Sequence, residues 1–227
     1  MSLVDWARIH TVLLDMDGTL LDLRFDELFF LQTVPMAYAR HHQIDDTAAR
    51  QRVLAAYQEA QGRLEWYDLD YWSRQFGFNI SLLKHDIAHL IQLRPQVELL
   101  LGQLRASGRP VWLVTNAHID SLTLKLQRTP IGNWLDGTIT SHEIGWAKEH
   151  AAFWPLLQQR LGFDPATTLL IDDAEAVLQA AADYGIGQLI HIATPNSSAN
   201  PVYSSRFPSI DDFDAILPVR VYEEGLI

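Results

Sequence analysis

Two carboxylates spaced two residues apart, Asp15 and Asp17 in the string DMDGTL, are the residues of this sequence best suited to do chemistry. They follow a short apolar, β-prone run from Val12 to Leu14, and Gly18 begins a turn directly after them. A carboxylate at the end of a strand can attack phosphorus, and a second one beside it can protonate the leaving oxygen. We therefore expect Asp15 to be a nucleophile that forms an aspartyl-phosphate and Asp17 to be its general acid and base. The alternative, a pair of turn carboxylates that cap a helix, is disfavoured by the strand before them.

Three more polar groups follow strands or lie between them. Thr115 and Asn116 end the apolar run PVWLVT, Asp172 and Asp173 follow the run TTLLI, and Lys148 lies in the region between. In open α/β sheets, functional groups gather beyond the carboxyl ends of the strands. We expect Thr115 and Asn116 to hydrogen-bond phosphate oxygens. Lys148 would supply the positive charge that balances the nucleophile and the phosphate.

Several carboxylates around a dianionic phosphate would repel it unless a hard cation lies between them. Oxygen ligands with open positions suit Mg2+. We expect Asp15 and Asp172 to bind this ion, with Asp17 and Asp173 as further candidate ligands and Asp173 acting either through water or as a supporting contact. Asp172 and Asp173 could also serve as the N-cap of the helix AEAVLQAAADYG, and both roles are compatible.

The remaining sequence predicts the elements that position these groups. Residues 25–92 show only helical periodicity, whereas from residue 94 onward helical and apolar β-prone runs alternate. Alternation of this kind predicts an α/β fold, a Rossmann-like parallel sheet with helices on both faces. We therefore predict a core formed by residues 1–22 and 94–227 and an all-α segment, residues 23–93, inserted after the first strand. The tail beyond residue 194 is rich in Pro, Ser and Asn, and only SIDDFDAIL suggests a short helix.

Composition narrows the classes of partner. The 227 residues contain 17 Lys and Arg against 28 Asp and Glu, which gives a formal charge of −11. That charge disfavours nucleic acid as a partner and leaves a small phosphomonoester as the expected substrate. The chain has no cysteine, its N-terminus does not resemble a secretory signal, and no apolar run is long enough to span a membrane. We expect a cytoplasmic protein with no membrane partner; the sequence indicates no oligomeric state.

The strings DMDGTL and VTN, the residue Lys148 and the string LLIDDAE together resemble the four ordered motifs of the haloacid-dehalogenase superfamily. The insertion after the first motif is similar to the helical cap of that superfamily. A departure is Glu149, which follows Lys148 where proline is commonest. A narrower resemblance, through LLDMDGTLLDL, WYDLDYW and TNAH, is to the bacterial GMP/IMP nucleotidases. It implies a 5′-nucleotidase that acts on purine monophosphates.

Substrate specificity is expected to reside in the cap, because it would close over the phosphate site. Three residues near the motifs are candidate substrate contacts. They are Gly18 in the first motif, Arg24 after that motif and His118 after the second. Four aromatic residues could stack on a purine or could simply form the core of the cap: Trp66, Tyr67, Tyr71 and Trp72. His85 and His89 are read as solvated helix residues without a role.

Other functions share part of this pattern. A haloacid dehalogenase would keep the nucleophile but would need no acid for a halide, so Asp17 argues against it. A phosphomutase, a sugar-phosphate phosphatase or a phosphoglycolate phosphatase would share all four motifs and is the alternative enzyme. A binder of phosphorylated ligands without turnover would have no need of both Asp15 and Asp17.

Overall fold

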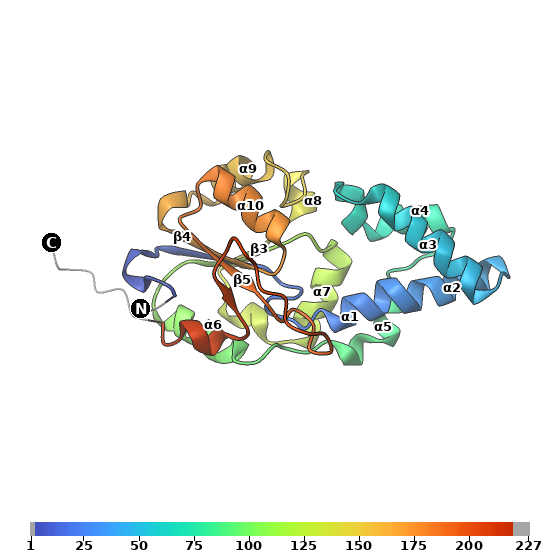
Figure 1. Ribbon diagram of the computed structural model, residues 1–227, viewed down its shortest axis with the longest axis horizontal. Helices are drawn as coiled ribbons and strands as arrows, with labels where there is room; N and C mark the ends of the chain where they lie inside the picture. The colour runs from blue at the N-terminus through green and yellow to red at the C-terminus, as the bar shows by residue number, and fades with distance from the viewer. Residues whose placement is uncertain (1–2, 220–227) are drawn as a thin grey trace.

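The computed structural model describes residues 3–219, and the last residues of the predicted core, 220–227, lie outside the described part. A sheet covered by helices forms one end of the molecule, and the helices from α1 to α5 project from it (Figure 1). No helix within residues 3–219 is both long and apolar enough to cross a membrane.

The sheet has six parallel strands in the order β3-β2-β1-β4-β5-β6. Their bounds are β1 Thr11–Leu14, β2 Val111–Thr115, β3 Gly137–Thr140, β4 Thr168–Asp172, β5 Gln188–Ile192 and β6 Ser209–Ile210. The chain runs outward from β1 through β2 to β3 and then returns to the other side of β1 with β4, so the strand order reverses at β1. Ligands bind at such a reversal, beyond the carboxyl ends of the strands. The predicted α/β fold class is confirmed.

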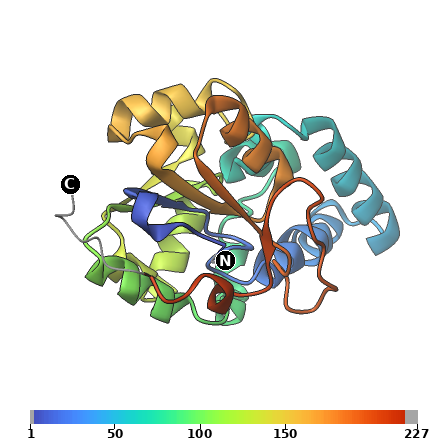
Figure 2. The same cartoon turned by 60° about the vertical axis from the view of Figure 1, so that its left-hand side comes forward.

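Helices cover both faces of the sheet, as Figure 2 shows. They are α6 Val97–Ala106 and α7 Ile119–Arg128 on one face, and α9 Phe153–Leu161 and α10 Glu175–Tyr184 on the other; the short α8 spans Ser141–Ile144. Alternate residues of a strand point to opposite faces. Val12 and Leu14 accordingly join the core cluster under α6 and α7, whereas Leu13 joins the cluster under α9 and α10.

The projecting segment consists only of helices in the structure and has its own apolar cluster, which includes Tyr57, Trp72 and Phe76. Its helices are α1 Arg24–Leu28, α2 Val34–His42, α3 Asp46–Ala60, α4 Leu69–Phe76 and α5 Leu83–Asp86, with a π-helical stretch at Phe29–Thr33 and 3-10 turns at Leu64–Tyr67 and Ala88–Leu90. The helical periodicity of SLLKHDIAHLIQL is not continuous in the backbone, since α5 ends at Asp86. The backbone leaves the helix at Ile87, where this residue and Ala88 pack near Phe25.

The two connections between the sheet and the helical segment lie side by side. Leu21 and Leu93 form an antiparallel bridge, and the N–H of Asp22 donates to the carbonyl of Gln92 at 3.0 Å. Arg94, which is 5% exposed, donates to the carbonyls of neighbouring loops and anchors this crossing. We propose that residues 1–22 and 94–227 form one unit and residues 23–93 another.

The tail contains an element that the sequence did not indicate. β6 is only two residues long, pairs with β5 and is followed by a 3-10 turn at Phe213–Ile216 in place of the expected helix. Two residues are too few to show an alternating pattern. The strand β6 therefore forms because its backbone pairs with β5, not because its own sequence favours a strand.

Candidate active site

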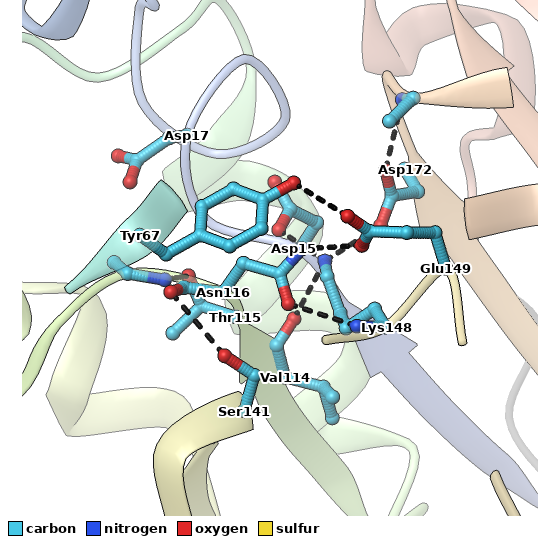
Figure 3. A network of polar contacts seen from close by, with 12 residues as sticks. Asp15, Asp17, Tyr67, Val114, Thr115, Asn116, Ser141, Lys148, Glu149 and Asp172 are labelled. Carbon is cyan, nitrogen blue, oxygen red and sulfur yellow. Dashed lines mark hydrogen bonds and ion pairs between the residues drawn. The ribbon is translucent and has the colours of Figure 1, made fainter. Parts of the chain in front are cut away.

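Lys148 lies at the centre of a buried ion-pair cluster at the carboxyl edge of the sheet (Figure 3). Its Nζ is 2.5 Å from Asp15 Oδ1 and 2.7 Å from Asp172 Oδ2, and it donates to the carbonyl of Val114 at 3.0 Å. Its burial lowers the pKa of the ammonium, but the two carboxylates outweigh that effect and hold the pKa above its usual value. Lys148 therefore places a fixed positive charge between the ends of β1 and β4.

Three carboxylates surround this one ammonium. Oxygen atoms of Asp15, Asp172 and Asp173 all lie within 4.8 Å of one another. Burial raises the pKa of Asp15 to about 6, against the attraction of Lys148 and with the repulsion of Asp172 added. Burial and the same neighbours raise the pKa of Asp173 well above its usual value. The cluster therefore has more negative charge than Lys148 alone can balance.

Asp15 has a free oxygen in this cluster. Its Oδ1 faces Lys148, whereas its Oδ2 is buried and has no hydrogen-bond partner among residues 3–219. A buried carboxylate oxygen without a partner is costly unless a cation or a ligand meets it. Three clustered carboxylates with one such oxygen form a set of hard donors that could hold a metal ion.

Asp172 has a second role beside this one. Its Oδ1 accepts from the N–H of Ala174 at 2.9 Å, at the start of α10, while its Oδ2 accepts from Lys148. The N-cap role expected from the sequence is wrong, because Ala174 is the N-cap of α10 and no side chain caps that helix; Asp172 instead accepts from the N–H of the N-cap residue. Gly18 allows Asp173 to approach, because it has a positive φ of 85° and a Cβ there would lie 2.4 Å from Asp173 Oδ2.

Asp17 lies on the wall of the same cavity but apart from the network around Asp15 (Figure 3). Its Oδ1 is 2.6 Å from the Nζ of Lys125, a residue of α7. Burial is the main reason that the pKa of Asp17 is raised to about 7, and repulsion by Asp26 adds to it. A carboxyl group with a pKa near neutrality can both give and take a proton, as a general acid and base must.

Thr115 is the last residue of β2 and Asn116 follows it, and both line the cavity. Thr115 Oγ1 accepts from the N–H of Ala117 at 3.0 Å, so its own O–H can be donated to a ligand. Asn116 is used largely within the protein, because its Oδ1 accepts from the N–H of Lys148 at 2.9 Å and its Nδ2 donates to Glu149 at 3.0 Å. Thr115 is therefore the freer of the two for a phosphate oxygen.

A cavity of about 380 Å³ opens over these groups. Its polar end includes Asp15, Asp17 and Lys148, and its other end lies under the helical segment. The apolar and aromatic residues of that end are Leu23, Phe30, Leu31, Tyr57, Trp66 and Leu69. A mostly apolar pocket of this size with a few convergent polar groups is typical of a small-molecule site.

Comparison with known proteins identifies the family. Residues 9–185 match the family model described as haloacid dehalogenase-like hydrolase. The chain belongs to that family. It is 36% identical over 215 residues to the GMP/IMP nucleotidase YrfG of Escherichia coli, with 95% of this chain and 97% of the relative covered.

More distant members of the haloacid dehalogenase-like hydrolases agree with this assignment. A phosphoglycolate phosphatase of Yersinia pseudotuberculosis is 27% identical over 81% of each chain. The crystal structure of a phosphatase of the family from Thermococcus onnurineus shares the fold with a TM-score of 0.75, at 23% identity and over 89% of this chain and 93% of that one. Within the family, this chain is an enzyme of the phosphatase type.

Glu149, the departure from the usual motif of this family, bridges the two parts of the hydrolase. Its Oε2 accepts from Asn116, and its Oε1 accepts from the hydroxyl of Tyr67 at 3.0 Å. Burial and the nearby Glu149 carboxylate raise the pKa of Tyr67, so its hydroxyl stays protonated and donates. A residue of the helical segment is thereby tied to the loop that holds Asn116 and Lys148.

Replacing Tyr67 by Phe should weaken substrate binding more than turnover. The substitution removes the Tyr67–Glu149 bond and leaves the Glu149–Asn116 bond intact. A hydrogen bond to a carboxylate contributes about 1.5 kcal/mol, so we expect KM to rise roughly tenfold with kcat nearly unchanged. Steady-state kinetics measure both constants.

The matched control is Tyr203→Phe. Tyr203 is exposed and donates to the carboxylate of Asp211 at 2.8 Å, outside the cavity. The Tyr203→Phe substitution should leave KM unchanged. Equal constants for the Tyr67→Phe variant and the parent would show that the bridge does not assist binding.

The remaining candidates from the sequence separate into two groups. His118 lines the cavity and caps α7 by accepting from the N–H of Asp120 at 3.3 Å, with Asp68 3.8 Å from its Nε2. Arg24 is exposed at the start of α1 and is not among the residues that line the cavity.

The four cap aromatics also divide. Trp66 and Tyr67 line the cavity, whereas Trp72 is 1% exposed in the core of the helical segment and Tyr71 packs against that core. Trp72 donates from its ring nitrogen to the carbonyl of Trp66 at 2.9 Å, which fixes the turn before α4. Trp66 and Tyr67 can therefore stack on a base in the cavity, whereas Trp72 cannot reach one.

Sequence analysis missed three charged residues beside the site, Asp26, Lys84 and Lys125. Asp26 and Lys84 line the cavity, and Lys125 contacts Asp17 and Asp26. A signal was available for Lys125, because Ser121 and Leu122 precede it at helical spacings of four and three and all three are buried. A lysine on the apolar face of a predicted helix indicates a buried partner.

Proposed function

We propose that the protein hydrolyses phosphomonoesters through an aspartyl-phosphate on Asp15. The observation that supports this most is the buried Lys148 between Asp15 and Asp172, together with the unpartnered Oδ2 of Asp15. A lysine that neutralises the nucleophile lets a dianionic phosphate approach it. A carboxylate oxygen of Asp15 attacks phosphorus, and the bond from phosphorus to the ester oxygen breaks.

Asp17 acts on the leaving group in this proposal. In its protonated form it gives a proton to the departing alkoxide, so that an alcohol leaves. As a carboxylate, it then takes a proton from the water that attacks the phosphorus of the aspartyl-phosphate, which releases inorganic phosphate and restores Asp15. Thr115 donates its O–H to a phosphate oxygen through both steps.

Mg2+ is the cofactor we propose, held by Asp15, Asp172 and Asp173, with Asp17 as a further candidate ligand. The excess of negative charge over Lys148 and the unpartnered Asp15 oxygen support a hard cation at this cluster. When bound, Mg2+ neutralises phosphate oxygens and stabilises the charge that develops on them.

Removal of magnesium should abolish turnover. With a chelator present, phosphate release is expected to fall to background and to recover when Mg2+ is added in excess. A readout besides activity is the melting temperature: Mg2+ at about 100 times its dissociation constant stabilises the fold by about 2.7 kcal/mol. Asp172→Asn should lose most of that gain. Full activity in the chelator would contradict the metal assignment.

The substrate we propose is a purine nucleoside monophosphate. The identity to the GMP/IMP nucleotidase over nearly the whole chain supports it, and so does a cavity with carboxylates at one end and Trp66 toward the other. The product pair would be a nucleoside and phosphate. A cysteine-free chain suits a reducing compartment, and we propose the cytoplasm as its location.

Phosphate release from a panel of phosphomonoesters tests this specificity. The panel contains GMP, IMP, AMP, pyrimidine monophosphates, phosphoglycolate and sugar phosphates, each assayed with Mg2+. We expect the highest kcat/KM for GMP and IMP. A preference for phosphoglycolate or a sugar phosphate would keep the chemistry and overturn the nucleotide assignment.

A further inference from the structure

All lysines of this chain are buried beside the cavity. Lys84, Lys125 and Lys148 are the only three in the 227-residue sequence, and arginine supplies every other permanently cationic side chain. Their exposed fractions are 2%, 1% and 2%. Lysine is almost never fully buried unless it is paired, because its ammonium loses strong hydration. Lys148 belongs to the nucleophile cluster, so the other two call for an explanation.

These two lysines form a chain of alternating charge that begins at Asp17. Lys125 Nζ lies 2.6 Å from Asp17 Oδ1 and 2.6 Å from Asp26 Oδ2, and Lys84 Nζ lies 2.8 Å from Asp26 Oδ1. Two ammonium groups balance two carboxylates, so the set is neutral as it stands. It needs no further ion, unlike the cluster around Asp15.

These ion pairs connect the core to the helical segment. Asp17 follows β1 and Lys125 belongs to α7, whereas Asp26 lies on α1 and Lys84 on α5. Asp26 uses one oxygen for the lysine of each part. The position of Asp17 is therefore connected, through two ion pairs, to how the helical segment is seated.

Aromatic rings limit the movement of both lysines. Lys84 Nζ is 4.4 Å from the ring centroid of Phe29 and 5.0 Å from that of Phe25, and Lys125 Nζ is 5.2 Å from that of Phe25. Contacts of this kind attract an ammonium to the ring face. The aliphatic part of the Lys125 side chain is buried, and its ammonium lies between two carboxylates and an aromatic ring. The position of this ammonium is therefore fixed.

We propose that Lys125 is a positioning residue for the acid step: supported by Asp26 and Lys84, it fixes one oxygen of Asp17 and so aims the other at the leaving group. This role rests on the proposed phosphatase function. Lys125 contacts neither Asp15 nor the phosphate-binding residues in the described contacts. Its loss should therefore affect proton delivery and spare the nucleophile.

Lys125→Met tests this role, because methionine keeps the length and loses the charge. For GMP we expect kcat to fall about 30-fold and KM to stay within about twofold of the parent. General-acid catalysis raises the rate by about 10²–10⁴-fold, and only part of that gain depends on the orientation of the Asp17 carboxyl group. For p-nitrophenyl phosphate, whose leaving group departs as a stable anion, we expect the single-turnover rate of the first, phosphoryl-transfer step to fall less than about threefold. Equal losses on both substrates would mean a merely structural lysine and would overturn the role.

Two double variants sharpen the result. Lys125→Met combined with Asp17→Asn should be no slower on GMP than Asp17→Asn alone, because residues that act through one another are not additive; additive losses would overturn the role. Lys125→Met leaves two buried carboxylates with one ammonium, that of Lys84, and so an excess of one negative charge. Asp26→Asn/Lys125→Met restores neutrality and repeats the two-substrate test with balanced charge. Arg128→Met, a charge removed from the exposed face of the same helix, is the control and should match the parent.

The scarcity of lysine offers a readout independent of activity. Selective 15N labelling of lysine should give three Nζ signals in NMR, one per residue. We expect Asp17→Asn to shift the Lys125 signal and to leave the Lys148 signal in place; an unmoved Lys125 signal would overturn the contact. If the parent releases no phosphate from any ester, the proposed function fails and this role with it, whereas an active parent with equal losses overturns the role alone.

Discussion

Asp15→Asn is expected to abolish phosphate release and to leave the protein at least as stable as its parent. Asn keeps an oxygen that can accept from Lys148 but cannot form the aspartyl-phosphate. Loss of a covalent nucleophile lowers kcat by roughly 10⁴-fold or more. The same change removes one of three carboxylates crowded around a single ammonium.

The stability gain follows from the raised pKa of Asp15, which is about 6 in the folded chain against an ordinary value of 3.8. A carboxyl group whose folded pKa is raised binds its proton more tightly when folded. Its ionisation therefore costs stability, a cost that grows between about pH 4 and pH 6 and is complete above that range. The attraction of Lys148 is already included in this pKa. At neutral pH without Mg2+, Asn should stabilise the fold by up to about 3 kcal/mol.

Thermal unfolding in the presence of a chelator measures this gain, and phosphate release with Mg2+ measures the loss. Asp5→Asn, at an exposed position, is the matched control and should change neither quantity. Added Mg2+ should narrow the difference in melting temperature, because the ion stabilises the parent more than the variant. An active Asp15→Asn variant, or one that unfolds at a much lower temperature, would contradict the site as described.

Asp17→Asn is expected to lose activity in a way that depends on the leaving group. A nucleoside leaves as an alkoxide and needs a proton, whereas p-nitrophenolate leaves as a stable anion. General-acid catalysis contributes about 10²–10⁴-fold, so the rate of phosphoryl transfer to Asp15 should fall by about that factor for GMP and by much less for p-nitrophenyl phosphate. Single-turnover measurements on both esters separate the chemical step from product release.

The second half-reaction offers a check on the same variant. Since Asp17 also deprotonates the attacking water, the Asp17→Asn variant should release p-nitrophenolate in a burst and then turn over slowly. Asp22→Asn is a suitable comparison, because Asp22 lies in the same loop but accepts from the N–H groups of Arg24 and Ser197 and faces away from this chemistry. Equal losses on both esters, with no burst, would remove Asp17 from the acid role.

Sequence reasoning succeeded where strands carry their chemistry at their ends. The runs before Asp15, Thr115 and Asp172 are apolar and buried, and the polar residues that follow each run had only one sheet edge to reach. The helical periodicity of the runs between the strands likewise predicted α6, α7, α9 and α10. These features depend on local pattern and on the geometry of parallel sheets.

The residues that the sequence does not reveal are those whose partners are distant along the chain. Asp17 and Lys125 are 108 residues apart, and Lys84 and Asp26 are 58 apart, so nothing near either lysine shows its partner. The expectation that Asp17 acts as general acid and base did not include its contact with Lys125. Composition held a clue, since a chain with three lysines and many arginines has little need of lysine at its surface.

The position of Arg24 also differs from the one that the sequence suggested. Its place after the first motif suggested a substrate contact, but the helix that begins there turns its side chain to solvent. The direction of a helix at its first residue is set by tertiary packing, here by Phe25 in the apolar cluster under α7. Position along the chain does not decide position in a cavity.

Covalent trapping tests the central claim most directly. The enzyme is mixed with substrate and Mg2+, quenched in acid within the first turnover, digested and analysed by mass spectrometry. A phosphoryl group on the peptide that carries Asp15, absent from the Asp15→Asn variant, is the predicted result. Phosphate release without any phosphorylated peptide, or with the group on another residue, would contradict Asp15 as the nucleophile.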